Sequence, residues 1–172
     1  MTETERLFLG FSVEKLRELT PRIEDCLDKL DEAQIWARGG ENENAIGNLV
    51  LHLCGNVRQW IIAHVGGKPD LRERDREFSA REGPDRLELR RLLRETVSEA
   101  SEVIQALPPS ELATRRVIQA YDVSVLEAIY HVVEHFSMHT GQIIFATKLL
   151  TGGDMGFYRH LDSGKAHGKA VP

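Results

Sequence analysis

The 172-residue sequence has only two cysteines, Cys26 and Cys54, and no long apolar run. Two cysteines are too few for a disulfide framework and show no metal-type pairing, so we interpret both as buried small apolar residues. No stretch approaches the roughly 18 apolar residues of a membrane span. The first residues carry Glu3 and Glu5, whereas a secretory signal needs a basic start. These absences predict a soluble, cytoplasmic protein without a membrane partner.

The sequence also lacks an excess of positive charge. Lys and Arg total 22 against 27 Asp and Glu, which gives a formal charge of −5. Nucleic-acid binding requires a basic surface, so we expect no nucleic-acid partner. The motifs G-x-S-x-G, G-x-G-x-x-G, His-Glu-x-x-His and the P-loop are absent. No Glu is followed by a His three residues later, which excludes a di-iron carboxylate bundle.

Hydrophobic periodicity predicts an all-α protein with a single domain over residues 1–158 and a flexible tail over 159–172. Four helices are expected, at about residues 3–30, 45–65, 85–107 and from 122 or 124 to just before Gly152. Pro21 either kinks the first helix or starts a second one capped by Thr20.

The segments between these helices have no strand alternation. Residues 38–44 are predicted to form a turn, and residues 110–122 are predicted to be irregular. The loop over 66–84 is long for a compact domain, and such loops are often functional.

Three histidines, His131, His135 and His139, are spaced four residues apart in the last predicted helix, and His52 lies in the second. Taking Val125 as zero, the three fall at about 240°, 280° and 320°, beside the apolar face. His52 occupies a similar border position on its own helix. Two helices can turn such borders toward each other, which would form a polar pocket beside a hydrophobic core.

Neutral imidazole is the commonest protein ligand of zinc-like metals. His131 and His139 are roughly 12 Å apart along the helix axis, so one ion cannot bind both. Adjacent pairs can share an ion, and the angle of His139 favours the pair His135 and His139. Glu134 falls on the solvent side and is discounted as a ligand.

A structural interpretation of these histidines stands beside the metal site. Histidines at the edge of a core are often hydrogen-bonded side chains without a ligand role, and we interpret His64, His160 and His167 in this way. Three imidazoles along one helical seam would be costly to bury without partners. Spacing alone therefore leaves metal binding and structural packing both open.

Two blocks, NAIGNLVLHLCGNVRQWI at 44–61 and HVVEHFSMHTGQI at 131–143, resemble the DinB-like (DinB/YfiT) superfamily. RDREF at 74–78 and DKLDEAQIWAR at 28–38 are similar to an uncharacterised branch of it. The resemblance implies a four-helix bundle with a long crossing loop between helices two and three. It implies a divalent metal, nickel or zinc, with iron or manganese as further options. Carried over by position, the metal ligands are His52, His135 and His139, with Gln142 as a pocket residue.

Such a metal keeps an open position and lowers the pKa of a water or thiol bound to it. The resemblance therefore implies a small-molecule substrate and either S-transfer from a low-molecular-weight thiol or hydrolysis. His131 is a candidate catalytic residue. Asp75 and Glu77 are further acid–base candidates, although ion pairing with neighbouring arginines is the more frequent role of such residues. Trp60 is interpreted as a core residue.

The alternative is a non-catalytic metal- or ligand-binding helical bundle that acts as a sensor or a dimeric scaffold. A homodimer is compatible with either function, because bundle helices with spare apolar faces often pair.

Overall fold

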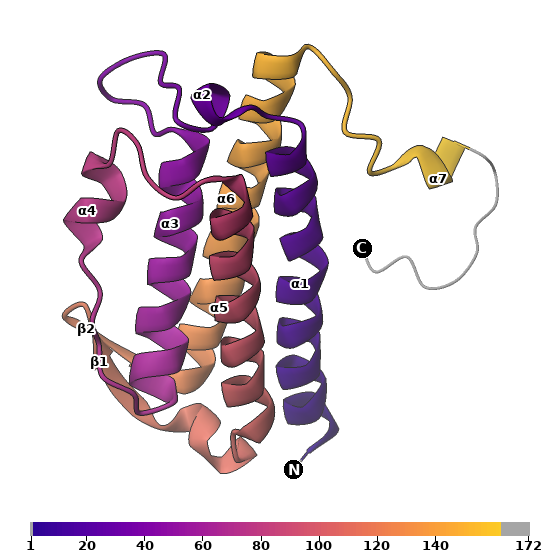
Figure 1. Cartoon of the computed structure of the whole chain (residues 1–172). Coiled ribbons are helices and arrows are strands. Elements are labelled where there is room, and N and C mark those ends of the chain that lie inside the picture. Colours follow the sequence, from indigo (N-terminus) through magenta and orange to yellow (C-terminus); the bar gives the residue numbers. More distant parts are fainter. Residues whose placement is uncertain (1, 163–172) are drawn as a thin grey trace.

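Four long helices make up most of the structure. The computed structural model describes residues 2–162. Helices α1 (Glu3–Asp28), α3 (Ile46–Val57), α5 (Arg86–Ala106) and α6 (Val125–Thr151) lie alongside one another (Figure 1). The chain is mostly helical, which is consistent with the predicted all-α class.

Side-chain caps fix where two of these helices begin. The Asp85 carboxylate accepts a hydrogen bond from the backbone N–H of Glu88 at 2.8 Å and starts α5. Ser124 and Glu127 form a reciprocal capping box at the start of α6. Gly152 ends α6 in the left-handed conformation, with φ of 65°, which glycine adopts without strain. These boundaries agree with those predicted from the sequence.

Pro21 does not divide the first helix. Helix α1 continues from Glu3 to Asp28 through the proline, so of the two alternatives the second helix capped by Thr20 is excluded. The Thr20 hydroxyl instead donates to the carbonyl oxygen of Leu16 at 2.8 Å, within the helix itself. This bond joins Thr20 to the preceding turn of α1, so its side chain does not cap a new helix at Pro21.

The second predicted helix is correct in extent but changes type along its length. Helix α3 is followed without a break by the π-helix η1 (Arg58–Val65). The backbone N–H of Gly66 donates to the carbonyl of Ile61, five residues earlier, at 2.8 Å. π-helical turns are rare and frequently occur at functional sites.

Several short elements join the long helices. The loop predicted over 66–84 contains α4 (Arg74–Ser79), which lies beside α3 (Figure 1). Helix α2 (Glu32–Ile35) follows α1, and the 3₁₀ helix η2 (Pro109–Ala113) follows α5. Helix α7 (Arg159–Asp162) occupies the start of the predicted flexible tail, and the rest of that tail lies outside the described residues.

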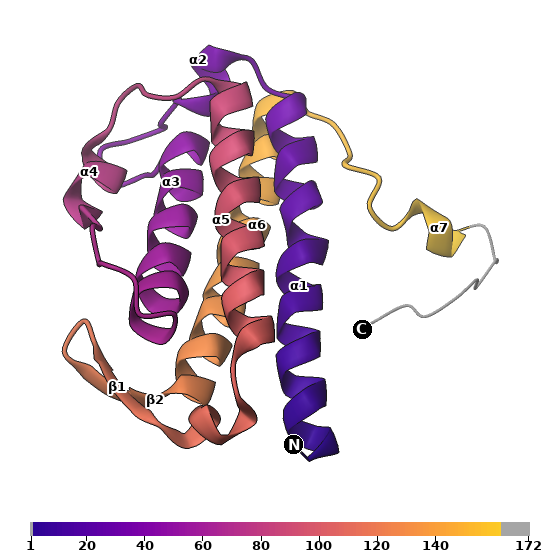
Figure 2. The same ribbon diagram turned by 60° about the horizontal axis from the view of Figure 1, so that its bottom comes forward.

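A β-hairpin replaces most of the segment predicted to be irregular. Strands β1 (Arg115–Ile118) and β2 (Tyr121–Ser124) pair antiparallel and extend below α3 (Figure 2). The turn residues Gln119 and Ala120 have φ values of 51° and 69°. Two-residue hairpin turns with positive φ usually contain Asn-Gly or another glycine, which makes them recognisable in a sequence. The strands are four residues long and lack that signal, so the prediction of no strands was wrong.

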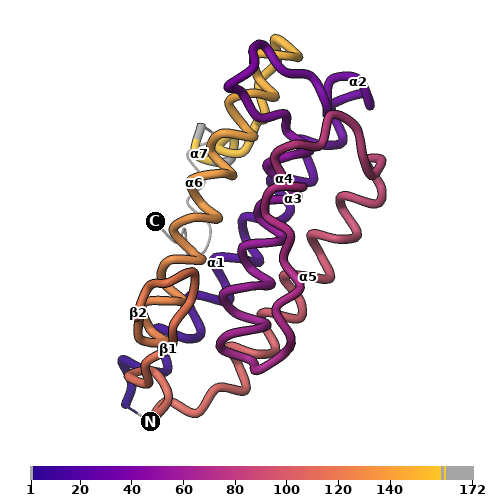
Figure 3. Tube along the Cα trace, turned by 90° about the vertical axis from the view of Figure 1, so that its left-hand side faces the viewer, coloured from indigo at the N-terminus to yellow at the C-terminus, as the bar shows by residue number. Residues whose placement is uncertain are grey.

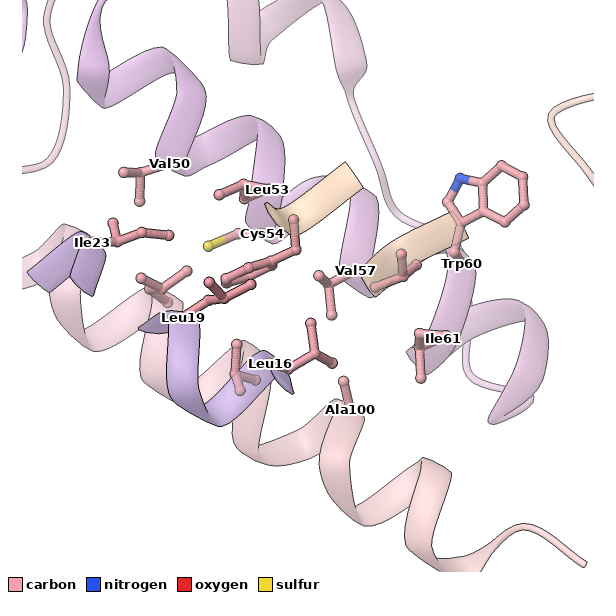
Figure 4. Packing of buried hydrophobic residues seen from close by; sticks show 14 of the residues in the cluster. Leu16, Leu19, Ile23, Val50, Leu53, Cys54, Val57, Trp60, Ile61 and Ala100 are labelled. Carbon is pink, nitrogen blue, oxygen red and sulfur yellow. The ribbon is translucent and has the colours of Figure 1, made fainter. Parts of the chain in front are cut away.

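The hydrophobic core lies between the long helices. Helices α1 and α3 both contact α5 and α6, so α3 and α6 are neighbours. Leu16 and Ile23 of α1 point into the same cluster of buried side chains as Leu53 and Val57 of α3 (Figure 4). The predicted core face of α6 is buried throughout: Val125, Ile129, Val132, Phe136 and Ile143. With their apolar faces turned inward, α3 and α6 bring their histidine-bearing borders together.

Both cysteines are buried in this core, as predicted. Burial raises the pKa of the Cys26 thiol to about 11 and that of Cys54 to about 12. The reactive species of cysteine is the thiolate, so neither residue is a nucleophile near neutral pH.

Within residues 2–162, no helix combines the length and apolar composition that a transmembrane span requires.

Candidate metal centre

Helices α3 and α6, both drawn in the trace of Figure 3, contact each other. Three histidine rings from these two helices lie together there. His52 comes from α3, and His135 and His139 come from α6. The Nε2 atom of His135 lies 3.0 Å from Nε2 of His52 and 3.1 Å from Nε2 of His139. All three ligand atoms lie within 4.8 Å of one another, so the three side chains could hold a metal ion.

The hydrogen bond at Nδ1 of His52 shows which of the two ring nitrogens carries the proton. His52 Nδ1 lies 2.9 Å from Oε2 of Glu77, which also accepts from Arg72 Nη2 at 2.8 Å. Burial alone would raise the pKa of Glu77, but hydrogen bonds from Arg72 and His52 outweigh it and lower the pKa. Glu77 is therefore a carboxylate and only accepts hydrogen bonds. His52 donates from Nδ1 to Glu77, which leaves a lone pair on Nε2.

Arg72 also approaches His52 directly, with Nη2 at 3.1 Å from Nδ1. Both groups are donors once His52 carries its proton on Nδ1, so this approach is not a hydrogen bond. The guanidinium instead binds both carboxylate oxygens of Glu77, at 2.7 and 2.8 Å. Arg72 thus fixes Glu77, and Glu77 fixes the ring of His52.

His139 is oriented in a similar way from its own helix. Its Nδ1 lies 2.6 Å from Oε1 of Gln142, three residues later. The amide oxygen accepts the Nδ1 proton, so the Nε2 lone pair of His139 also faces His135. Gln142, predicted as a pocket residue, holds the orientation of a histidine in the cluster.

The donor set fits a cation. Burial and the neighbouring histidines lower the pKa of His135 to about 3, and burial lowers that of His139. His135 Nε2 can supply at most one proton, whereas two lone pairs point at it. A metal ion would accept one lone pair from each of the three Nε2 atoms. The nitrogens of a tetrahedral zinc site are roughly 3.3 Å apart, close to the 3.0 and 3.1 Å that separate His135 Nε2 from the other two.

The close approach of Glu77 to α3 depends on Gly55. A Cβ atom at position 55 would lie 1.9 Å from Oε1 of Glu77 and 3.0 Å from Nε of Arg72. Any larger residue would therefore push this buried ion pair away from His52.

The buried Asn48 and the partly buried Arg38 hold α4 in place so that Glu77 reaches the cluster. The Asn48 amide donates to the carbonyls of Glu77 and Ala80 at 2.8 and 2.9 Å. Arg38 donates to the carbonyls of Phe78 and Ala80 at 2.6 and 2.9 Å. The predicted functional loop is thus attached to the start of α3 by backbone contacts that do not depend on the loop's own charges.

His131 lies next to the cluster but is not part of it. Its ring stacks on Trp60 with centroids 4.1 Å apart, and its centroid is 5.5 Å from that of His135. Burial lowers its pKa, so the ring is neutral at pH 7. Trp60 is buried, as predicted for a core residue.

The remaining sequence candidates lie elsewhere. Asp75 and Glu134 are exposed. His64 lies 3.5 Å from Asp70. Two further histidines are not described: the side chain of His160, and His167 as a whole. Glu77 makes the expected ion pair with Arg72, but its contact with His52 was missed.

Comparison with solved structures supports the fold. The chain is similar to a crystal structure described as the conserved protein of a locus from Enterococcus faecalis, with a TM-score of 0.71 and 16% sequence identity. The match covers 89% of this chain and 99% of that one. At this identity the likeness concerns the fold alone. No curated protein matches the chain.

The sequence was also compared with models of protein families. The model described as "Protein of unknown function (DUF1572)" matches residues 3–159. This range contains the whole histidine cluster together with Arg72, Glu77 and Gln142. The chain therefore belongs to the DUF1572 family.

Proposed function

We propose that this protein is a metal-dependent enzyme with the four-helix-bundle fold of the DinB-like superfamily. His52, His135 and His139 bind one divalent metal ion. The observation that carries the proposal is the convergence of three Nε2 atoms, with His135 at 3.0 and 3.1 Å from the other two. In two of these rings the Nδ1–H group donates a hydrogen bond: His52 donates to Glu77, and His139 donates to Gln142.

An all-imidazole ligand set favours nickel or zinc, with iron or manganese as weaker alternatives. Three protein ligands leave at least one coordination position open, as in catalytic rather than structural zinc sites. When bound, the ion supplies Lewis acidity and lowers the pKa of a thiol or water that it coordinates.

The proposed reaction is S-transfer from a low-molecular-weight thiol to a small electrophile, or hydrolysis of a small substrate. The resemblance to the DinB-like superfamily supports the first of these. Arg72, Glu77 and Gln142 hold the histidine rings in one orientation. To His131, beside His135 but outside the cluster, the proposal assigns proton exchange with the substrate.

The position of the cluster favours a catalytic over a structural metal. The three histidines lie at the border of α3 and α6, while the apolar core forms independently between the four long helices. We therefore expect chelation to remove activity and leave the helical circular dichroism unchanged. The free energy of unfolding should fall only by the contribution of metal binding, about 2.7 kcal/mol for metal at 100 times its Kd, with a corresponding fall in the melting temperature.

The test uses untagged protein loaded with Ni²⁺ or Zn²⁺. Two reactions are followed for the loaded, chelated and His135→Ala/His139→Ala proteins. The first is the reaction of free cysteine, the low-molecular-weight thiol, with 1-chloro-2,4-dinitrobenzene, and the second is the hydrolysis of p-nitrophenyl acetate. Turnover confined to the loaded parent supports the proposal. Metal binding without turnover by any form would favour the non-catalytic alternative. Unfolding on chelation would contradict the catalytic assignment.

A further inference from the structure

A cavity of about 490 Å³ lies between α3 with its continuation η1, the segment from Lys68 to Glu77, and Glu99 of α5. After η1 the chain turns back and runs alongside α3 to α4, so this segment faces the helix (Figure 1). Cavities of roughly 300–1,000 Å³ commonly bind small molecules. The space between the helix and the returning segment therefore has the size of a ligand site.

One wall of this cavity is a single face of the helix. Leu51, Gly55 and Arg58 recur at four and three residues, which places them on one face of α3, and Ile62 lines the cavity from η1. His52 follows Leu51 directly, so its side chain points about 100° away from that face. The cavity and the histidine cluster thus lie on different faces of the same helix.

Arg72 and Glu77 stand between the cavity and the cluster. Both line the cavity, and both approach Nδ1 of His52 on its other side. Their side chains are only 3% and 9% exposed and are joined by two hydrogen bonds, so they form a closed wall. A molecule in the cavity would contact this pair without reaching the histidines.

The segment opposite the helix is held in place and presents an apolar side chain. The backbone N–H of Arg72 donates to Oδ1 of Asp70 at 3.1 Å, and the Arg72 side chain binds Glu77. Leu71, between these two anchored residues, lines the cavity but is 86% exposed. With Leu51 and Ile62 on the helix, it offers apolar surface on both sides of the space. The body of a matching ligand is therefore apolar.

The charges at one end of the cavity are unbalanced. Arg58 and Lys68 both pair with Glu99, at 3.3 and 2.5 Å, so one carboxylate faces two cations. The hydrogen bond from Lys68 is the main cause of a lowered pKa of Glu99, which keeps that carboxylate ionised. One positive charge is left over at this end.

The other lining charges are matched within the protein. Arg72 pairs with Glu77 and Arg76 with Glu73. The Asp70 carboxylate accepts from Gln59 at 2.8 Å and from the backbone of Arg72. The excess of positive charge is thus confined to Arg58 and Lys68, which favours a ligand with one negative charge. A phosphate monoester would place a second negative charge beside Glu99.

We propose that this cavity binds a small carboxylic acid with an apolar body. The carboxylate lies at Arg58 and Lys68, and the apolar body lies between Leu71 and the helix residues Leu51 and Ile62. The site goes beyond the proposed function, because none of its groups depends on a metal ion.

The experiment follows the amide signals of the metal-free, ¹⁵N-labelled protein by NMR during titration with two probes. Octanoate carries the carboxylate, and octanamide is an uncharged molecule of the same shape. Both should shift the signals of Leu51, Gly55 and Leu71 in a saturable way. Octanoate should bind about three- to fivefold more tightly, the value of an exposed ion pair. This preference should shrink at about 1 M NaCl, which screens exposed charges.

Two substitutions of exposed side chains separate the apolar contact from the charge. Leu71→Ala removes apolar contact area and should raise the Kd of both probes about fivefold. Lys68→Gln removes the excess charge, since Arg58 and Glu99 then balance, and should abolish only the preference for octanoate. Lys68 is 57% exposed, so neither variant disturbs the core.

The matched controls are Leu87→Ala and Lys148→Gln, at side chains that are 67% and 48% exposed and do not line the cavity. Both should bind the two probes like the parent. No saturable shift with either probe at millimolar concentration, or shifts that leave Leu51, Gly55 and Leu71 unchanged, would overturn the site. Equal affinity of the parent for octanoate and octanamide would overturn the assignment of a carboxylic acid.

Discussion

Replacing His135 and His139 together by alanine should weaken the binding of Ni²⁺ or Zn²⁺ by more than about a thousandfold, measured by calorimetric titration of the metal-free protein. The change removes two of three ligand nitrogens, and His52 alone cannot retain the ion. The metal-free variant should remain folded, because neither histidine belongs to the apolar core. The double substitution also removes the unfavourable approach of the His52 and His139 lone pairs to Nε2 of His135.

The control for this variant is His64→Ala. His64 is a half-buried histidine that lies 3.5 Å from Asp70, outside the cluster. It should bind metal with the affinity of the parent. Retention of tight, stoichiometric binding by the double variant would show that the ion is held elsewhere.

Glu77→Gln should lower metal affinity by about 10–100-fold, the usual effect of removing a carboxylate that orients a ligating histidine. The amide has one acceptor oxygen for two donors, His52 and Arg72. It also leaves the Arg72 guanidinium, only 3% exposed, without its counter-charge. Breaking such a buried pair should lower the free energy of unfolding by about 3 kcal/mol or more. Calorimetry and urea denaturation measure the two effects.

Glu73→Gln is the matched control from the same loop. Glu73 pairs with Arg76, but the two side chains are 61% and 80% exposed. An exposed pair contributes about 0–1 kcal/mol, so this variant should resemble the parent in stability and metal affinity. If Glu77→Gln were equally silent, the contact with His52 would have no part in holding the ion.

Helical periodicity placed the histidines at the edges of apolar faces, and the resemblance to the DinB-like superfamily supplied the ligand set of His52, His135 and His139. The 100° rule placed His52, His135 and His139 beside the apolar faces of their helices, and packing of those faces makes α3 and α6 neighbours. The same rule identified the buried face of α6 and the exposed position of Glu134. These features follow from local spacing, which a sequence displays directly.

The role of Glu77 could not be predicted in this way. In the sequence it belongs to the mixed charge run RERDREF, which is typical of a solvated loop. Its burial depends on long-range contacts: Asn48 and Arg38 bind backbone carbonyls near α4, and Gly55 leaves space against α3. A glycine inside an apolar helix was the one local signal of this close approach.

The hairpin and the π-helix were missed for a different reason. The strands at residues 115–118 and 121–124 are short, and their turn uses Gln119 and Ala120 where glycine or asparagine is usual. The π-helix keeps the composition of the helix that precedes it, so no residue marks the change at Arg58. In both cases tertiary packing overrides the local preference.

The most direct test of the metal centre is elemental analysis of the protein purified without a histidine tag, beside the His135→Ala/His139→Ala variant. We predict close to one equivalent of nickel, zinc or another divalent transition metal per chain in the parent and none in the variant. Absence of metal from both proteins, even after incubation with Ni²⁺ and Zn²⁺, would contradict the account. The three histidines would then be packing residues at the border of α3 and α6.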